Sequence, residues 1–378
     1  GGLACATTPS MGGDVGGMGS TFNPLVGGGL GHTPMIGKVI HEFIPPANLL
    51  PYLEGIVSVW NLLGRRDNKY KARIKILVRA MGIDGFRDKV EEEWAHSKSG
   101  PGTLPEAEIS RVEAFFAPPS YSQQPDESNA LADHRLANPK FSQWLQHNVI
   151  GHKAPGYAAV TLSTKATGVP PGDVSDTQID AVAQWAADYS FSEVRISHEQ
   201  NFVLPHVPKQ HLFELWQKAQ AQNLATANAR LITDMICCPG GDYCSLANAK
   251  SIPVAEALQQ RFDDYDFQYD LGELNLNISG CMNACGHHHV GHIGILGVDK
   301  KGSEFYQISL GGHAGHSEMA PSLGQIVGPS IARAEICDVI AKILEIYVDL
   351  RIQDESFLGC FKRVGMAPFK ERIYAPSH

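Results

Sequence analysis

Four cysteines in two short segments are the residues of this chain best suited to chemistry. Cys238 and Cys244 are separated by five residues in CCPGGDYC, and Cys281 and Cys285 by three residues in SGCMNACG. Four thiolates from two loops can enclose one tetrahedral zinc ion or hold one iron–sulfur cluster. Paired cysteines of structural zinc sites are usually separated by about two to four residues, so the wider first gap favours a cluster and leaves zinc as the alternative.

The residues around these cysteines fit a bulky anionic centre. The Gly-Gly of CPGGDYC, together with Gly280 and Gly286, allows backbone amides to approach such a group closely. Cys237 is an alternative first ligand, because it is adjacent to Cys238 and only one of two neighbouring side chains should reach the same centre. Cys337 lies in an apolar helical pattern and is predicted to be a buried small side chain.

Three other segments hold candidate binding residues. Six lysines and arginines lie between Arg65 and Lys75, a density that on its own is typical of a solvated helix face. The run Gly27 to Gly29 allows close approach of the backbone to a ligand, although a lone glycine run is a weak signal. The pair Gln200-Asn201 on its own indicates an ordinary hairpin turn.

The elements that must position these residues alternate between strand and helix patterns, which predicts an α+β chain. The stretch from Leu49 to Arg79 is largely helical in pattern, whereas the residues after Ser97 are polar and rich in Pro-Gly and Ser. We expect five segments: a Gly-rich leader without structure (1–23), a first cofactor-domain half (24–100), a linker with short helices (101–150), a ferredoxin-like half-domain (151–233) and a cysteine-bearing domain half (234–378).

The order of elements in residues 151–233 is that of a ferredoxin-like unit. Ser175 and Gln178 form a predicted capping box at the start of its first helix, and Pro208 opens its second helix. The predicted strands are Ala158–Thr164, Glu193–Ser197, Phe202–Leu204 and one more after the second helix. For the cysteine-bearing half we expect helices at Ile252–Phe262 and Ile331–Leu350, and strands at Val290–Val298 and Phe305–Leu310.

Composition excludes several classes of protein. The chain has 378 residues and a formal net charge of −9, which argues against a general nucleic-acid binder. No run approaches the roughly 18 apolar residues of a membrane span. Its eight cysteines are clustered, which favours metal or redox chemistry in a reducing compartment over a disulfide scaffold. Because the first residues lack the pattern of a secretory signal, we expect a cytoplasmic location.

Longer strings around these motifs resemble the siroheme-dependent nitrite and sulfite reductase family. CPGGDYCSLANAKSIP and SGCMNACGHHHVGHIGILGVDKKG look most like the hemoprotein (beta) subunits of bacterial assimilatory sulfite reductases. VGGGLGHTP, GRRDNKYKARIKIL, PGYAAVTLS and RISHEQNFVLPHV look like further blocks of those subunits in the same order. The resemblance runs from about Pro24 to the C-terminus and strengthens the prediction of a cluster over zinc.

The resemblance implies both a fold and a set of site residues. The fold would be α+β, with a ferredoxin-like half-domain and two halves of a domain that binds siroheme and a [4Fe-4S] cluster. Cys238, Cys244, Cys281 and Cys285 would bind the cluster, and Cys285 would also be the axial ligand of the siroheme iron, which makes it the catalytic cysteine. Residues implied to contact the siroheme and its carboxylates are Arg73, Lys71, Arg195, Asn201, Gly28 and Gly29.

The implied activity is the six-electron reduction of sulfite to sulfide in sulfur assimilation and cysteine biosynthesis. Nitrite reduction to ammonia is the alternative, and a non-catalytic metal-binding fragment is another. The electron donor would be a flavoprotein subunit or a ferredoxin. The family has a further N-terminal ferredoxin-like half and cationic anion-binding residues that we expect to be missing here. A second metal at His287, His288, His289 and His292 is disfavoured, because successive side chains diverge.

Overall fold

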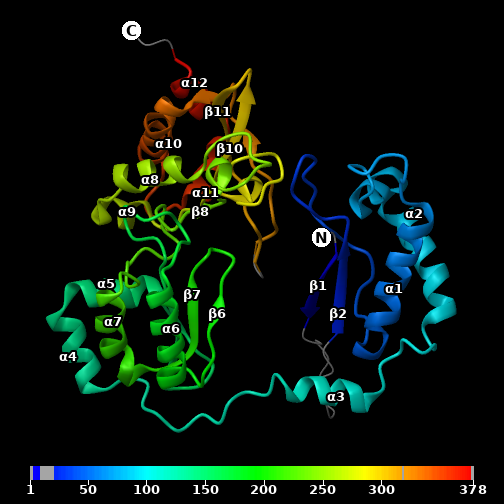
Figure 1. The fold of residues 1–378 in the computed structure, drawn as a ribbon, viewed down its shortest axis with the longest axis horizontal. Helices are drawn as coiled ribbons and strands as arrows, with labels where there is room; N and C mark the ends of the chain where they lie inside the picture. Colours follow the sequence, from blue (N-terminus) through cyan, green and yellow to red (C-terminus); the bar gives the residue numbers. More distant parts are fainter. Residues whose placement is uncertain (1–2, 9–20, 317–318, 376–378) are drawn as a thin grey trace. The chain divides into compact units, whose positions relative to one another are not determined.

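The computed structural model describes residues 3–8, 21–316 and 319–375, with side chains described from residue 21 onward. The chain divides into two compact units, Gly1–Pro118 and Pro119–His378, and each is described by itself (Figure 1). Both units mix helices and strands, so the expected α+β class is confirmed. Among the described residues, no helix combines the length and apolar character that a membrane crossing requires.

The first unit joins a small antiparallel sheet to a pair of helices. Its elements are β1 (Leu3–Thr8), β2 (Thr21–Val26), β3 (Lys38–Val39), α1 (Pro46–Leu63), α2 (Ile74–Ser97) and α3 (Glu106–Ala114). Helix α2 is kinked at Gly82, which has a φ of 76°. The core forms where α1 and α2 pack together, through residues such as Tyr52, Ile56, Val78 and Phe86.

The second unit begins with the ferredoxin-like half-domain. Its antiparallel sheet has the strand order β4-β5-β7-β6, and helices α6 and α7 lie beside it (Figure 1). The elements are α4 (Asn129–Ala137), α5 (Pro139–Asn148), β4 (Val149–Gly151), β5 (Tyr157–Leu162), α6 (Asp176–Tyr189), β6 (Arg195–Ile196), β7 (Phe202–Pro208) and α7 (Leu212–Ala221). The predicted capping box is present, because Gln178 N donates to Ser175 Oγ at 3.2 Å and Ser175 N donates to Gln178 Oε1 at 2.8 Å.

The rest of the second unit is built on a mixed sheet of order β12-β11-β10-β9-β8, with β13 paired to β11. Its strands are β8 (Ile236–Cys237), β9 (Leu276–Ser279), β10 (Ile293–Lys300), β11 (Ser303–Leu310), β12 (Gln325–Ile326) and β13 (Ile331–Ala332). Its helices are α8 (Ile252–Arg261), α9 (Tyr265–Leu271), α10 (Ile336–Leu350), α11 (Phe357–Val364) and α12 (Ala367–Ile373). Helix α10 is central, because α8, α11 and α12 pack against it.

Four short 3₁₀ helices complete the described elements. They are η1 (Lys209–His211), η2 (Gly240–Asp242), η3 (His288–Val290) and η4 (Arg333–Glu335). Two of them, η2 and η3, lie next to the cysteine segments. Strands β10 and β11 and helix α8 lie where the sequence patterns predicted them.

Several expectations are corrected. Strand β1 pairs with β2 through Leu3 and Val26, so residues 1–23 are not wholly without structure; residues 9–20 lie outside the described part. The linker ends early, because Phe141 and Trp144 of α5 are fully buried in the core of the half-domain. The fourth strand of the half-domain sheet is β4, which lies between α5 and β5, whereas a strand after α7 was expected.

The basic segment is also placed differently from the helical pattern. Helix α1 ends at Leu63 and α2 begins at Ile74, so most of the cationic residues lie in the loop between these helices. The helix expected at Ile331–Leu350 is shorter, since Ile331 and Ala332 form β13 and η4 follows.

Candidate functional site

The two cysteine segments meet at one edge of the mixed sheet. Cys238 follows β8, and Cys281 follows β9 by two residues. These strands are parallel neighbours, with Cys237 paired to Ile278. Because the carboxyl ends of parallel strands lie at the same edge of a sheet, the loops that follow them are brought together. The strand pairing therefore joins two segments that lie about 40 residues apart in the sequence.

Backbone hydrogen bonds hold the two loops against each other. Cys238 N donates to Ile278 O at 3.1 Å, and Gly280 N donates to Cys238 Sγ at 3.1 Å. Asn248 N and Ala249 N both donate to Gly280 O, at 2.9 Å and 3.1 Å. An amide directed at a cysteine sulfur is the interaction that stabilises thiolates bound to iron–sulfur clusters and tunes their potentials.

The loops can approach this closely only because two positions lack a side chain. Gly240 has a φ of +58°, and a Cβ atom there would lie 2.4 Å from Ser251 N. A Cβ atom on Gly280 would lie 2.8 Å from the Cα of Gly240 and 2.7 Å from Ala249 O. Backbone atoms of this kind cannot move aside cheaply, so both glycines are required by the packing of the loops.

The four thiols lie within electrostatic range of one another. Burial raises the pKa of Cys285, and the thiols of Cys238, Cys281 and Cys244 raise it further. Within the described ranges, however, no three His, Cys, Asp or Glu side chains converge closely enough to hold a single metal ion.

The structure distinguishes Cys238 from its neighbour Cys237. The side chain of Cys237 is only 3% exposed and belongs to the hydrophobic core of the mixed sheet. Its Sγ donates to Cys238 O at 3.3 Å, and burial raises the pKa of the thiol. Cys237 is not among the groups that shift the pKa of Cys285, whereas Cys238 is. Cys238 is therefore the member of the pair that faces the other thiols.

Gln200, which the sequence indicated only as a turn residue, holds the strand that leads into Cys238. Its Nε2 donates to Cys237 O at 3.0 Å, and Cys237 N donates to its Oε1 at 2.9 Å. The side-chain amide thus pairs with both backbone groups of one residue, as a neighbouring strand would. Gln200 has a φ of 64°, an uncommon conformation for a residue with a side chain.

Asn201 belongs to a buried polar network. Its Oδ1 accepts from Lys165 Nζ at 2.8 Å and from Thr164 N at 3.1 Å, and its Nδ2 donates to Asp234 Oδ1 at 2.9 Å. Lys165 Nζ also lies 2.9 Å from Asp234 Oδ1 and donates to Glu199 O. The amide oxygen and one N–H of the 2% exposed Asn201 are thus used inside the protein. The structure favours a positioning role over the predicted siroheme contact.

Of the predicted cationic contacts, Arg195 lies in the second unit, on β6. Its side chain is exposed, and Arg195 Nε donates to Glu193 Oε1 at 2.6 Å. Lys71 and Arg73 lie in the first unit, in the loop before α2, and both are exposed. Arg73 Nη1 donates to Ala72 O at 3.0 Å, inside its own loop.

The glycine run of the first unit is held by a lysine that was not among the predicted contacts. Lys75 Nζ donates to Thr33 O at 2.7 Å, to Leu30 O at 3.3 Å and to Gly29 O at 3.4 Å. Gly28 lies against Gly37, and a Cβ atom on Gly28 would be 3.0 Å from Gly37 N. The glycine run therefore has a packing role within the first unit.

A small cleft lies beside the second cysteine loop. Its polar lining residues are His198, Glu199, Asp234, Asn275, Asn277 and His287. His198 Nε2 lies 2.7 Å from Glu199 Oε1, and this hydrogen bond raises the pKa of His198. The cleft thus joins the Gln200 turn to the residues that follow Cys285. Sequence spacing could not indicate it, because its polar lining residues come from four separate segments of the chain.

The histidines after Cys285 are not equivalent. His288 is buried, with neither ring nitrogen hydrogen-bonded within the described residues, and burial lowers its pKa to about 3. His292 is buried next to Phe357, and burial lowers its pKa to about 4. Both rings are therefore neutral in the folded protein near pH 7.

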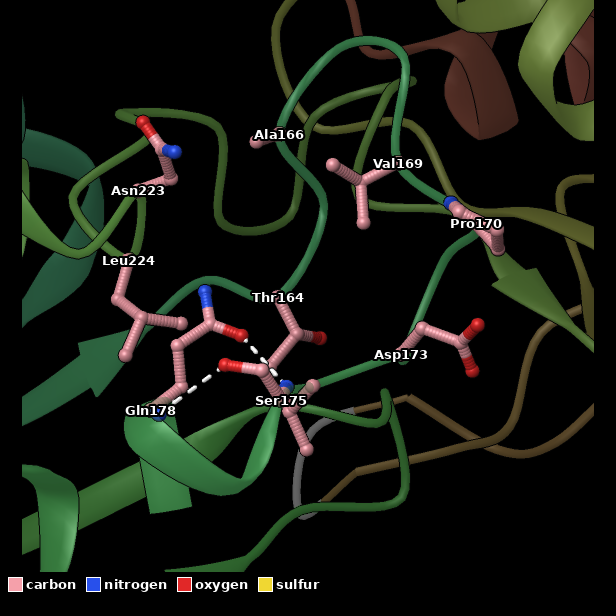
Figure 2. A pocket seen from close by; sticks show the side chains of 10 residues that line it. Thr164, Ala166, Val169, Pro170, Asp173, Ser175, Gln178, Asn223 and Leu224 are labelled. Atoms are coloured by element: carbon pink, nitrogen blue, oxygen red, sulfur yellow. Dashed lines mark hydrogen bonds between the residues drawn. The ribbon is translucent and has the colours of Figure 1, made fainter. Parts of the chain in front are cut away.

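A larger cavity, of about 470 Å³, lies in the half-domain around the N-terminal end of α6 (Figure 2). Ser175 and Gln178 line it, but their polar atoms are used in the capping box that Figure 2 shows. The other labelled side chains include Val169, Pro170 and Leu224. None of its lining residues is a cysteine or a histidine, so size alone does not locate the redox chemistry.

Models of two known protein domains match the segments that hold these residues. The model of the nitrite and sulphite reductase 4Fe-4S domain matches residues 10–98 and 229–377, and that of the nitrite/sulfite reductase ferredoxin-like half domain matches residues 152–222. A "Sulfite reductase [ferredoxin] 2" of Mycolicibacterium paratuberculosis is 26% identical over 342 residues, covering 88% of this chain and 54% of the relative. A chloroplastic "Ferredoxin--nitrite reductase" of Arabidopsis thaliana is 23% identical, covering 85% of this chain and 50% of the relative.

A solved structure agrees on the fold. The Mycobacterium tuberculosis NirA protein superposes with a TM-score of 0.68 at 23% identity, covering 93% of this chain and 58% of that chain. The chain thus spans about half the length of the curated relatives named here. The matched model is that of a 4Fe-4S domain, and the family match indicates siroheme and a [4Fe-4S] cluster as the cofactors. With most of both units matched, this chain belongs to the nitrite and sulphite reductase 4Fe-4S family.

Proposed function

We propose that this chain carries the electron-delivery part of a siroheme-dependent sulfite reductase. The observation that carries the proposal is the group of four thiols at one sheet edge, three partly or fully buried and Cys285 exposed. Cys238, Cys244, Cys281 and Cys285 would hold the cluster. Cys285, reachable from solvent, would also be the ligand to the siroheme iron.

The residues present fit this centre. The amide of Gly280 already points at Cys238 Sγ, and Gly240 and Gly280 allow the two cysteine loops to pack closely. The pKa of Cys285 is raised in the metal-free protein, so its proton must leave when metal binds. When bound, the cluster and siroheme supply one-electron transfer and the iron at which the anion is reduced.

Exposed cations suit the carboxylates of siroheme. Arg195 in the second unit, and Arg73 and Lys71 in the first, keep exposed side chains that can pair with such anions. Gly28 and Gly29 would lie against the cofactor through their backbone, in a loop that Lys75 holds. The buried network around Asn201 and the Gln200 amide would act indirectly, by fixing the strand before Cys238.

The proposed reaction is the six-electron reduction of sulfite to sulfide in sulfur assimilation and cysteine biosynthesis. Nitrite reduction is the second candidate, because the relatives include ferredoxin–nitrite reductases. The donor would be a ferredoxin or a flavoprotein subunit, since the relatives' names include both ferredoxin- and NADPH-dependent enzymes. The clustered thiols suit a reducing compartment, and we place the protein in the cytoplasm.

The test is reconstitution of the full chain with siroheme, iron and sulfide. We expect siroheme absorption bands and four irons per cluster with acid-labile sulfide, and the relative turnover of sulfite and nitrite with a low-potential donor distinguishes the two candidate substrates. One zinc and no labile sulfide would instead support a non-catalytic fragment. Faster turnover of nitrite would support the second candidate.

A matched pair of variants tests the assignment of the ligands. Cys285→Ser should remove the coupling between siroheme and cluster in the electron paramagnetic resonance spectrum. Cys337→Ser should leave that spectrum unchanged, because Cys337 packs against the core through α10. Equal effects of the two substitutions would contradict the assignment.

A further inference from the structure

Three side chains with metal-binding atoms meet in the half-domain, away from the cysteine loops. His152 Nε2 lies 3.1 Å from His206 Nδ1, and Tyr121 Oη lies 3.2 Å from the same nitrogen. Their rings stand edge-on to one another, with centroids 5.3 Å to 5.7 Å apart. Ligand atoms that each lie about 2 Å from one metal ion are roughly 3 Å apart, which is close to the two atom–atom distances of 3.1 Å and 3.2 Å in this cluster.

The far nitrogen of His206 faces a carboxylate, whereas the far nitrogen of His152 accepts from Ala154 N at 2.8 Å and lies near the carbonyl oxygen of the same residue. His206 Nε2 lies 3.2 Å from Glu193 Oε2, and His152 Nδ1 lies 3.4 Å from Ala154 O. Histidines that bind metals usually donate their other N–H to a carboxylate or a backbone carbonyl, which directs the free lone pair at the ion. The carboxylate of Glu193 therefore fixes the tautomer that leaves His206 Nδ1 as an acceptor.

The three residues come from separate segments that the fold fixes in place. His206 lies on β7, His152 follows β4, and Tyr121 belongs to the extended chain before α4. Tyr157 holds that extended chain, because Ser122 N donates to its Oη at 3.2 Å. His206 is 8% exposed, and burial lowers its pKa, so the ring is neutral near pH 7 and free to bind a cation.

A route from solvent reaches this cluster. A surface cavity is lined by Tyr121, Ser122 and Gln124 on one side and by Ala154 and Pro155 on the other. Tyr121 and His152 are themselves partly exposed. Two of the three side chains are thus accessible from solvent in the folded half-domain, whereas His206 is buried.

We propose that Tyr121, His152 and His206 form a binding site for one divalent transition-metal ion. Imidazole nitrogens and a phenol oxygen suit ions such as nickel, copper(II) or zinc. Across the described ranges no three His, Cys, Asp or Glu side chains converge on one ion, so the site depends on the phenol as its third ligand. The bound ion would fasten the extended chain before α4 to the sheet of the half-domain.

Binding requires two proton movements. In the metal-free protein His152 Nδ1 accepts from Ala154 N at 2.8 Å, which places the ring proton on Nε2. On binding, Nε2 releases its proton to solvent and Nδ1 takes one up from solvent, so the hydrogen bond from Ala154 N is lost and Nδ1 donates to Ala154 O instead. Tyr121 has a raised pKa, chiefly from burial, so it is a neutral phenol without metal and releases its proton to solvent when it becomes a ligand.

Nickel chloride titrated into the tag-free, cofactor-loaded full chain tests the proposal by calorimetry. We expect one site that is lost in His206→Ala and weakened at least about tenfold in Tyr121→Phe, which removes only the phenol oxygen. Glu193→Gln should weaken it by about 10- to 100-fold, because the carboxylate only orients His206. His211→Ala, at a partly exposed histidine of the same half-domain, is the matched control and should bind as the wild type does.

Two measurements keep the outcome decisive. Acid-labile sulfide after each titration shows that the cysteine centre is intact, so a lost site cannot be attributed to the cluster. Thermal unfolding without nickel shows which variants fold. If His206→Ala does not fold, nickel binding by Tyr121→Phe and Glu193→Gln tests the proposal. Wild-type binding that equals that of the Tyr121 and Glu193 variants would overturn the proposal and leave only a hydrogen-bonded cluster.

Discussion

Replacing Lys165 by methionine should destabilise the second unit strongly. Lys165 and Asp234 form an ion pair at 2.9 Å, with side chains 0% and 3% exposed. Methionine fills similar space but leaves the Asp234 carboxylate buried without its cation. The loss also removes a donor from Asn201 Oδ1 and from Glu199 O. Breaking one side of a buried ion pair costs about 3–5 kcal/mol, so we expect a loss in that range.

The partner substitution separates the unpaired charge from the loss of the pair itself. In Lys165→Met/Asp234→Leu no ionised group remains in the network, and replacement of a whole buried pair by apolar residues is often close to neutral. Asn201 and Arg230 N, which donate to Asp234, still lose an acceptor. We therefore expect the double variant to recover about half or more of the lost stability.

Urea unfolding of the two variants and the wild type measures these differences. Tryptophan fluorescence follows the half-domain through Trp144, Trp185 and Trp216, which lie in its core. Hydrogen exchange then shows whether protection is lost around Asp234 first. The interpretation that water is excluded from this ion pair and that its two members are closely coupled would be refuted by either of two results. One is a decrease of less than about 1 kcal/mol in the free energy of unfolding of Lys165→Met, and the other is a double variant no more stable than that single variant.

Three further predictions follow from the site. Cys238→Ala should lose most bound iron and labile sulfide, whereas Cys237→Ala should keep both and lose only about 1 kcal/mol of stability for its buried thiol. Lys75→Met should lower the thermal stability of the first unit by about 1–2 kcal/mol, measured by calorimetry, because three carbonyl groups lose a charged donor. His288 and His292 have pKa values of about 3 and about 4 in the folded state. Below about pH 6.5 the unfolded chain therefore binds protons at these histidines and the folded chain does not. The free energy of unfolding should fall as the pH is lowered, by about 2 kcal/mol per histidine at pH 5. Urea midpoints that stay constant between pH 7 and pH 5 would contradict this.

Local signals predicted the parts of the fold that depend on neighbouring residues. The Ser175 capping box is made by atoms three residues apart, and the structure has it as predicted. The cysteine motifs are similarly local, because each pair lies in one short loop. The end of the linker was missed for the opposite reason. The α5 segment is short and polar in sequence, and only its packing against α7 shows that Phe141 and Trp144 belong to a core.

The residues that position the site depend on contacts between distant segments. Gln200 contacts Cys237 across 37 residues, and Lys165 contacts Asp234 across 69. No periodicity connects such positions, so local pattern predicted Gln200 and Asn201 only as a turn, and the siroheme contact of Asn201 came from the family resemblance alone. Their neighbours in space decide that Asn201 is buried and that its amide holds other residues in place.

The assignment of the four thiols depends on exposure as much as on spacing. Cys237 and Cys238 have almost the same spacing to Cys244. They differ because the side chain of Cys237 lies in the hydrophobic core, whereas Cys238 is only partly buried. The second pair shows the same order of exposure, because Cys281 is 8% exposed and Cys285 is exposed. A thiolate shared by two metal centres must be reachable from outside the cluster. Cys285 meets that condition, since it is exposed although Ala284, directly before it with a φ of 58°, is buried.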